Sequence, residues 1–331
     1  MMSAHDPLVA VVTPVFNGEK YLEECIESVL AQTYQNWVYE IVDNCSTDST
    51  LKLAERYAKK DNRIRARSYG VFVDVMESYN RSLRLISSQS KYCKLVSADD
   101  FLMPSCVDKM VNLAESSPTI GIVGSYQLCR GDVIWKGLPT DLPTMSGRTV
   151  CRRLLLERLP VHGNQTSSLY SADLIRRHGS FFPHQFPYAD RSAMYEYLQY
   201  CDFGFVHEPL SFQRTHEAQV TSRVDRQLGM WNIGLLDDFC RYGRIYLTEE
   251  EFQEQKHQIL GEYYRWLSTC VLQMKPKTFW EFQERRLAEF GCRIRWGEVL
   301  KGLISEIGEE IQSPKVAFGK FMVAMRNRRG E

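Results

Sequence analysis

Apolar positions in the first part of the chain follow two alternating spacings. Residues 8–13 form a continuous, mostly apolar run, which is typical of a strand buried on both faces. Between Tyr21 and Leu30, apolar residues recur every three or four positions, which predicts a helix. The same alternation predicts strands at 37–42, 64–67, 92–96 and 120–125, and helices at 50–59, 75–86 and 107–114. Strands that alternate with helices in this way predict a parallel sheet with right-handed connections.

The pattern loosens after residue 125. Loops are expected at residues 137–147 and 162–168, and helices at 148–157, 173–177 and 191–200. Two short strands are expected at 203–206 and 210–214, separated by Pro209. Beyond about residue 225 only helical patterns remain. We therefore expect an α/β domain at residues 1–220 and a helical region at residues 221–331.

Composition narrows the class of protein. Hydrophobic residues make up 44% and charged residues 25% of the chain, as in ordinary globular proteins. The formal net charge is zero, so no overall field attracts nucleic acid, and we expect no nucleic-acid partner. The ten cysteines show no Cys-x-x-Cys spacing and residues 1–12 no signal peptide, which favours a cytoplasmic protein with reduced thiols. No apolar run approaches the ~20 residues that cross a bilayer.

Two adjacent carboxylates follow the predicted strand at residues 92–96. Asp99 and Asp100 would lie at the carboxyl edge of the sheet, where open α/β sheets bind ligands. Two neighbouring like charges repel each other, so such a pair is usually kept for a cation or a polyhydroxyl ligand. The alternative is structural, because Asp99 could instead cap a helix that begins near Pro104.

A third carboxylate, Asp43, ends the predicted strand at residues 37–42. A carboxylate at a strand end can accept hydrogen bonds from a base N–H or a ribose hydroxyl. It can also form an Asx-turn that only shapes the loop. Because a second acidic pair is expected on the same edge, we favour a ligand-binding role and expect Asp43, Asp99 and Asp100 to face one crevice.

An ordered series of motifs resembles the family 2 glycosyltransferases of GT-A fold. The resemblance covers roughly the first 220 residues, and its N-terminal half is the most specific part. Ser97-Ala98-Asp99-Asp100 resembles the Asp-x-Asp-type motif of that family. The other matching stretches are Thr13-Pro14-Val15-Phe16-Asn17-Gly18-Glu19-Lys20-Tyr21-Leu22, Ser28-Val29-Leu30-Ala31-Gln32-Thr33-Tyr34 and Val42-Asp43-Asn44-Cys45-Ser46-Thr47-Asp48-Ser49-Thr50.

The resemblance implies a fold and a reaction. The fold would be α/β, a GT-A (Rossmann-like) mixed sheet flanked by helices, with a helical C-terminal appendage. The reaction would be an inverting transfer of a sugar from a nucleotide-diphosphate sugar, by default a UDP-sugar, to a hydroxyl group. The acceptor would be a saccharide or a lipid-linked compound in polysaccharide, glycolipid or glycan synthesis. A Mg²⁺ or Mn²⁺ ion would neutralise the diphosphate that leaves.

The resemblance also implies roles for single residues. Asp99 would contact the ribose, and Asp100 would hold the divalent metal. Ser97 stands where many family members have another Asp, which puts the metal preference and affinity in doubt. The nucleotide pocket would be lined by Pro14, Phe16, Glu19 and Asp43.

Asp190 is the candidate general base. The family usually has Glu-Asp at the start of a helix here, whereas this chain has Ala189 followed by Asp190. An inverting transfer needs one carboxylate to take the proton of the acceptor hydroxyl as its oxygen attacks the anomeric carbon. The structural alternative is that Asp190 only caps the helix that follows it.

Further polar residues match the family with less specificity. Arg214 and His216 resemble an Arg-x-His segment, in which Arg could pair with phosphate oxygens and His could bind phosphate or the metal. Asn164, in the stretch His162-Gly163-Asn164, falls where the family places a loop that faces the sugar. Asn80 and Arg81 lie on the helix before the acidic strand and could reach the diphosphate or sugar. For each of these residues, a structural or surface role is the open alternative.

The C-terminal segment has the pattern of a basic amphipathic helix. Such a helix can lie on an anionic membrane surface, which would place the enzyme at the inner face of the cell membrane. It could equally pack on its own domain or on a second copy in a homo-oligomer. Its apolar stripe is Phe318, Phe321, Met322 and Met325, and its basic residues are Lys315, Lys320, Arg326, Arg328 and Arg329.

Two other functions remain open from the sequence. A nucleotidyltransferase also combines a nucleotide fold with paired acids, but it would want a Gly-rich, basic loop after the first strand, unlike Phe16-Asn17-Gly18-Glu19. A catalytically inactive nucleotide-sugar-binding subunit is the other alternative. It is suggested by the departures from the family pattern at Ser97 and Ala189.

Overall fold

The computed structural model describes residues 6–158, 163–182, 188–216, 225 and 227–312. The chain divides into two compact units, residues 1–219 and residues 220–331, which are considered one at a time. Two predictions lie outside the described residues: the role of His162, and the basic amphipathic helix with its contacts to a membrane or a second copy.

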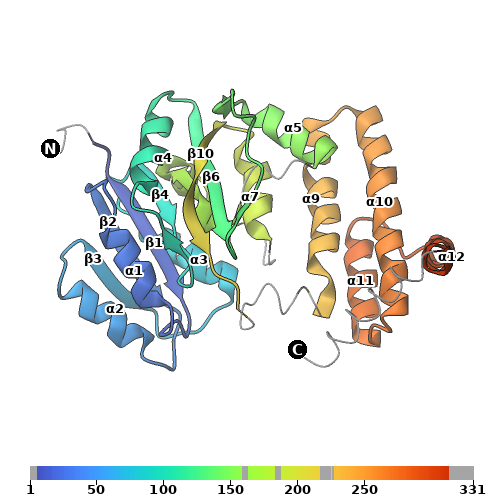
Figure 1. Ribbon diagram of the computed structural model, residues 1–331, viewed down its shortest axis with the longest axis horizontal. Coiled ribbons are helices and arrows are strands. Elements are labelled where there is room, and N and C mark those ends of the chain that lie inside the picture. The colour runs from blue at the N-terminus through green and yellow to red at the C-terminus, as the bar shows by residue number, and fades with distance from the viewer. Residues whose placement is uncertain (1–5, 159–162, 183–187, 217–224, 226, 313–331) are drawn as a thin grey trace. The chain divides into compact units, whose positions relative to one another are not determined.

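The first half of the N-terminal unit has the predicted alternation of strands and helices (Figure 1). Four strands are parallel neighbours in the order β3-β2-β1-β4. Parallel strands end at one edge, so their following loops gather there. The elements are β1 (Val9–Val15), α1 (Leu22–Leu30), β2 (Trp37–Asp43), α2 (Thr50–Ala58), β3 (Ile64–Ser68), α3 (Val75–Leu83) and β4 (Tyr92–Leu95).

The second half makes the sheet mixed, which confirms the predicted α/β class. The ten-stranded sheet continues from β4 through β9, β6 and β10 to β5, and β9 is antiparallel to both β4 and β6. The elements are β5 (Phe101–Leu102), α4 (Cys106–Glu115), β6 (Ile120–Cys129), β7 (Asp132–Ile134), β8 (Thr144–Met145), α5 (Gly147–Glu157), η1 (Gln165–Ser167), β9 (Ser168–Ser171), α6 (Ala172–Arg177), α7 (Ala189–Tyr197) and β10 (Asp202–Gln213).

One local prediction in this half is wrong, and the short strands β5, β7, β8 and β9 were not predicted. Pro209 does not separate two strands, because β10 runs through it, and the register with β6 shifts on both sides of Pro209. The bulge removes the need for the N–H that proline lacks. Of the missed strands, β9 lies inside the sheet; its first residue ends the predicted loop at residues 162–168, and no element was predicted at residues 169–171. Its four residues include two serines, so neither spacing nor hydrophobicity marks it as a strand.

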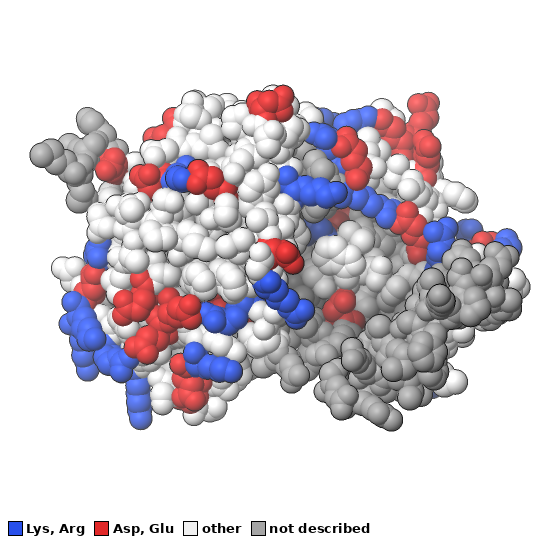
Figure 2. All heavy atoms as spheres, viewed as in Figure 1, with Lys and Arg blue, Asp and Glu red and all other residues white. Residues whose placement is uncertain are grey.

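A hydrophobic core fixes this scaffold. Trp37 and Tyr39 of β2 are buried, and Ile26 of α1 and Met110 of α4 belong to the same cluster. Each such side chain contributes on the order of 1.5–3 kcal/mol by its removal from water. On the outer surface of this unit, acidic and basic side chains are interspersed on the face shown in Figure 2. The core therefore supports the strand ends, and the charged side chains visible on this face lie at the surface.

The second unit is helical, as the sequence predicts. Its helices are α9 (Met230–Tyr246), α10 (Glu249–Leu272), α11 (Lys277–Glu289) and α12 (Trp296–Gln312) (Figure 1). Thr248 and Glu251 form a capping box that starts α10, because each side chain accepts a hydrogen bond from the other's backbone N–H. Among the described helices of the whole chain, none combines the length and apolar character needed to cross a membrane.

Candidate active site

Asp99 and Asp100 lie beyond β4 at the edge where the parallel strands end. Val15, the last residue of β1, is opposite Asp43, the last residue of β2, and β4 runs parallel to β1 on its other side. The three acids therefore share one edge of the sheet, with β1 between Asp43 and the Asp99–Asp100 pair. This is the arrangement that a ligand spanning two strand ends requires.

Asp100 is a buried carboxylate with polar partners on several sides. Only 2% of the residue is exposed. Its Oδ1 accepts the backbone N–H of Arg214 at 3.1 Å, and its Oδ2 accepts the side-chain amide of Asn164 at 3.3 Å. Burial, together with the neighbouring charge of Asp99, raises the pKa of Asp100 to about 7. A bound cation would favour the ionised form and offset this cost.

Asp99 is tied to the segment that follows β10. Its Oδ2 lies 3.0 Å from Nε2 of His216, and its backbone oxygen accepts the Arg214 Nε–H at 2.9 Å. Arg214 also pairs with Glu24 at the start of α1, at 2.6 Å. The His216 ring lies 4.9 Å from the ring of Tyr21. These contacts bring the predicted residues Asp99, Arg214 and His216 together in one cluster with Asp100 and Asn164.

Ser97 joins a neutral network where many family members have a carboxylate. Its hydroxyl lies 3.2 Å from the Tyr79 hydroxyl, 3.2 Å from Nε2 of Gln165 and 3.3 Å from Oγ1 of Thr166. The Ser97 backbone N–H also donates to Thr166 Oγ1 at 3.0 Å. The serine thus holds the η1 segment beside β4 without adding a third negative charge near Asp100.

Lys94 supports the same segment and was not singled out from the sequence. It is fully buried on β4, and its ammonium donates to the backbone oxygens of Thr166 and Ser168. Burial lowers the pKa of Lys94 from its usual value. The available signal was a lysine in the middle of an otherwise apolar strand, a position where a charged residue needs a partner.

Asp43 and the first loop form a second group at this edge. Asp43 is buried and accepts hydrogen bonds from the Ser46 N–H at 3.2 Å and the Ser68 hydroxyl at 3.3 Å, so it does shape its loop. Glu19 accepts the Ser49 N–H at 2.9 Å and thereby ties the loop after β1 to the loop after β2. These hydrogen bonds do not use all the acceptor capacity of the Asp43 and Glu19 carboxylates.

Phe16 offers an aromatic surface beside these loops. Its side chain is 47% exposed, and its ring lies 4.9 Å from the ring of Phe72, which is 59% exposed. Pro14, in contrast, lies within β1 opposite Val42 and is buried. Phe16 and Pro14 were both predicted to line the nucleotide pocket. Phe16 has the exposed side chain, whereas Pro14 belongs to the strand that supports the pocket.

Asp190 begins α7 and is half-buried. Its Oδ1 accepts the N–H of Arg191 at 2.9 Å, and burial raises its pKa to about 6. Burial also raises the pKa of Tyr170 in β9, and the nearby charge of Asp190 adds to this effect. Asp190 therefore lies near β9, the strand beside β4. Ala189 is fully buried, so the glutamate that the family usually has there would have to be accommodated in the interior.

Asn80 and Arg81 do not join the acidic cluster through any contact in the described part of the chain. Asn80 is 5% exposed; its amide donates to the Ser180 hydroxyl and the Phe182 oxygen and accepts the Phe182 N–H. It therefore braces α3 against residues 180–182. Arg81 forms an ion pair with Glu77 at 3.0 Å. These contacts give both residues structural partners, and their contact with the diphosphate or sugar stays a prediction.

The donor set at the sheet edge suits a hard divalent cation that keeps water ligands. Asp100 supplies carboxylate oxygen, which Mg²⁺ and Mn²⁺ prefer. Among the described residues, there is no group of three or more His, Cys, Asp or Glu side chains that could hold a metal alone. The diphosphate of a bound nucleotide would therefore have to supply further oxygens, as is usual for Mg²⁺ in nucleotide sites.

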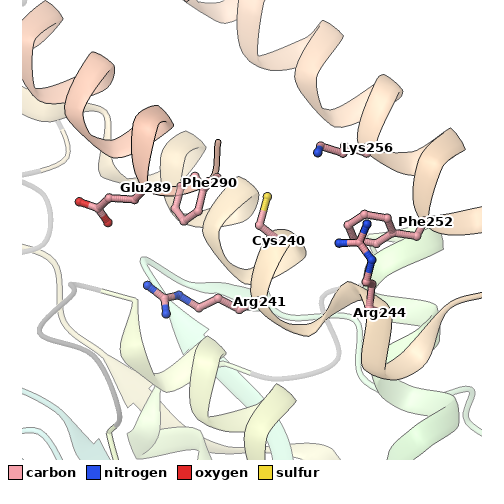
Figure 3. Close-up of a pocket in the computed structure, with 7 residues that line it drawn as sticks. All are labelled: Cys240, Arg241, Arg244, Phe252, Lys256, Glu289 and Phe290. Atoms are coloured by element: carbon pink, nitrogen blue, oxygen red, sulfur yellow. The ribbon is translucent and has the colours of Figure 1, made fainter. Parts of the chain in front are cut away.

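The helical unit contains a separate hollow of about 290 Å³ with a different character (Figure 3). Arg241 and Arg244 of α9 line it together with Lys256 and Phe252 of α10. Arg241 pairs with the buried Asp237 at 2.6 Å, and Arg244 packs 4.0 Å above the Phe252 ring. A lining with three cations does not suit a metal ion, so we do not assign the metal role to this hollow.

Comparison with known proteins places this site in a family context. The family model for glycosyl transferase family 2 matches residues 10–177, just over half of the chain. An uncharacterized glycosyltransferase of Haemophilus influenzae is 31% identical over 198 residues, which cover 56% of this chain and 58% of that protein. The chain spans about half the length of the curated relatives that it matches.

Solved structures share the fold at low sequence identity. TarS 1–349 from S. aureus, in complex with UDP-GlcNAc, has a TM-score of 0.62 and 15% identity, covering 85% of this chain and 80% of that chain. The mannosyltransferase PcManGT from Pyrobaculum calidifontis, in complex with GDP-Man and Mn²⁺, has a TM-score of 0.56 and 15% identity, covering 97% and 85%. This likeness confirms the predicted GT-A fold.

Proposed function

Because this chain belongs to glycosyl transferase family 2, we propose that it transfers a sugar from a nucleotide-diphosphate sugar to a hydroxyl acceptor with inversion. The observation that carries the proposal is the buried Asp100 beside Asp99 at the parallel-strand edge, within a cluster that includes Arg214 and Asn164. The TarS and PcManGT complexes with UDP-GlcNAc and with GDP-Man and Mn²⁺ support a nucleotide-sugar donor and a divalent metal.

The proposed mechanism uses two carboxylates with separate tasks. The Asp190 carboxylate takes the proton of the acceptor hydroxyl while its oxygen forms a bond to the anomeric carbon. The bond between that carbon and the diphosphate oxygen breaks, and the nucleoside diphosphate leaves. When bound at Asp100, Mg²⁺ or Mn²⁺ would supply positive charge against the diphosphate. Arg214, fixed against Asp99 and Glu24, keeps a guanidinium at the same edge.

The donor and acceptor classes belong to the same proposal. We take a UDP-sugar as the default donor because the family mostly uses it, and the Asp43 loop and the exposed Phe16 ring offer a carboxylate and an aromatic face to a base. The acceptor is proposed to be a saccharide or lipid-linked hydroxyl compound, in polysaccharide, glycolipid or glycan synthesis. This part rests on the family alone.

A donor screen tests the proposal. Release of nucleoside diphosphate is measured for UDP-, GDP- and dTDP-sugars with Mn²⁺, for the wild type, Asp100→Asn and Asp190→Asn. We expect Asp100→Asn to lose metal-dependent binding of UDP and Asp190→Asn to bind UDP but turn over at least 100-fold more slowly. Asp173→Asn, an exposed carboxylate on α6, is the matched control.

A second candidate function is a catalytically inactive nucleotide-sugar-binding subunit. It is favoured by two specific observations: the neutral network around Ser97 and the buried Ala189 next to Asp190. Tight binding of UDP and Mn²⁺ without turnover of any donor or acceptor in the screen would support this function and contradict the transferase.

A further inference from the structure

Four side chains form an unbroken series of hydrogen bonds that ends at Asp100. The Trp135 indole N–H donates to Oε1 of Gln127 at 3.3 Å. The Gln127 Nε2 donates to Oδ1 of Asn164 at 3.1 Å, and the Asn164 Nδ2 donates to Oδ2 of Asp100 at 3.3 Å. Gln127 lies on β6 and is fully buried. None of the sequence motifs included Trp135 or Gln127.

The two ends of this series fix the direction of every bond in it. An indole N–H can only donate, so the Gln127 oxygen must face Trp135 and its NH₂ group must face Asn164. The Asn164 oxygen then accepts from Gln127, and it also accepts the Thr166 N–H at 3.0 Å. Its NH₂ group is left for Asp100, which only accepts when ionised. Neither amide can rotate by half a turn without losing bonds at both ends.

We propose that Trp135 and Gln127 are positioning residues that hold the Asn164 amide so that it donates to Asp100 and keeps this carboxylate oriented for a divalent metal. The inference rests on the proposed function, because it takes Asp100 as the metal ligand. Partners behind a metal ligand fix its orientation, and their loss typically weakens metal binding about 10- to 100-fold.

The backbone around Trp135 supports this role. Trp135 has a φ of +73°, a left-handed conformation that is costly for a bulky residue and is found mostly where the surroundings impose it. A Cβ added at Gly163 would lie 2.2 Å from the Trp135 indole nitrogen, so residue 163 must be glycine for the ring to reach its place. The chain thus combines a strained backbone at Trp135 with a glycine at residue 163, at the point where the indole N–H donates to Gln127.

Three variants test the direction of the series. In Gln127→Glu, a second oxygen replaces the NH₂ group and would face the Asn164 oxygen, so the Asn164 amide must turn its oxygen toward Asp100. Gln127→Met removes both the oxygen and the NH₂ group of this side chain, so its hydrogen bonds to Trp135 and Asn164 are lost and not reversed. Trp135→Phe keeps an aromatic ring but removes the donor that sets the direction. Trp37→Phe is the matched control, because the buried Trp37 indole N–H has no partner within the described residues.

The primary readout is equilibrium binding of Mn²⁺ in the presence of UDP, measured by electron paramagnetic resonance, with melting temperatures measured in parallel. We expect Gln127→Glu to weaken Mn²⁺ binding on the order of 10- to 100-fold, and Gln127→Met and Trp135→Phe to weaken it less. Trp37→Phe should bind Mn²⁺ like the wild type. Gln127→Glu should weaken binding more than Gln127→Met, which a purely structural role would not produce.

The outcomes separate this inference from the proposed function. Unchanged Mn²⁺ binding in Trp135→Phe and Gln127→Met, with Asp100→Asn unable to bind, overturns the positioning role and leaves the metal site intact. Unchanged binding in Asp100→Asn overturns the metal site itself. If Gln127→Glu does not fold, Trp135→Phe compared with Trp37→Phe decides the question, since both keep a ring at the substituted position.

Discussion

The Nε2 of His216 lies 3.0 Å from the Oδ2 of Asp99, which makes the imidazole a partner of the carboxylate that was expected to contact the ribose. His216 also packs against Tyr21, which precedes α1. The contact therefore links the segment after β10 to the loop after β1 through the acidic edge. It gives His216 a role in fixing Asp99, and the predicted contact of His216 with phosphate or the metal stays a prediction.

We expect His216→Ala to weaken UDP binding roughly 5- to 10-fold, because Asp99 loses a charge-assisted hydrogen bond. His216→Gln can still donate an N–H to Asp99 and should retain most of the affinity. Titration calorimetry with UDP in saturating Mn²⁺ measures both. If His216 instead binds the metal, both variants should weaken Mn²⁺ binding to the same extent, and glutamine would rescue nothing.

The pKa of about 6 at Asp190 predicts the acid side of the pH profile. Below pH 6 this carboxylate is mostly protonated and cannot take the acceptor proton, so kcat should fall about tenfold per pH unit there. The measurement is kcat against pH at saturating donor and Mn²⁺. Asp190→Asn should lose at least 100-fold in kcat at pH 7.5 and show no such slope. A wild-type profile that stays flat down to pH 5 would mean that no group with a pKa near 6 limits turnover, and the kcat of Asp190→Asn alone would then decide whether Asp190 is the base.

The three hydrogen bonds of Asn80 predict that its loss affects folding more than binding. Asn80→Ala leaves the Phe182 N–H without its acceptor, whereas the Phe182 oxygen keeps the Ser180 hydroxyl as a donor, so the substitution should cost about 1–3 kcal/mol of stability. Thermal unfolding should show this, while the affinity for UDP stays within twofold. Arg81→Gln, next to it on α3, should change neither. A lower UDP affinity at an unchanged melting temperature would restore the predicted donor contact.

The sequence was sufficient for the parallel half of the sheet because each element there has its own spacing. The apolar runs of β1 and β2 and the helical repeat of α1 are visible without tertiary information. The strand β9 was not, since its place is set by pairing with β4 and β6 far away in the chain. The course of β10 through Pro209 could not be predicted either, because it depends on a shift of register between β10 and its partner strand β6.

The residues of the candidate site also differ in whether the sequence alone could identify them. Asp43, Asp99 and Asp100 could be found because they follow strands that are recognisable in the sequence. Lys94, Gln127 and Trp135 could not be assigned roles, because their partners are backbone oxygens or amides from distant segments. For Asn80 the sequence left two roles open, because a motif match places a residue on a helix but does not show which neighbour takes up its amide; its contact with the donor stays a prediction.

The raised pKa of Asp190 also predicts how stability depends on pH. Its folded pKa of about 6 lies above the ordinary value of 3.8, so the native state holds the proton more tightly than the unfolded chain. Stability therefore falls as the pH rises from about 4 to 6, and the cost, at most about 3 kcal/mol, remains in full above pH 6. Asp190→Asn removes the charge and escapes this cost.

We accordingly expect Asp190→Asn to melt a few degrees higher than the wild type at pH 8, with a smaller difference at pH 5. Asp173→Asn on the exposed surface of α6 should show no such pH-dependent gain. The measurement is thermal unfolding of the three proteins at both pH values. A variant less stable than the wild type at pH 8 would mean that the bond from the Arg191 N–H to the carboxylate contributes more than burial costs. Higher stability with lost turnover would instead show that this carboxylate is kept for catalysis at the expense of the fold.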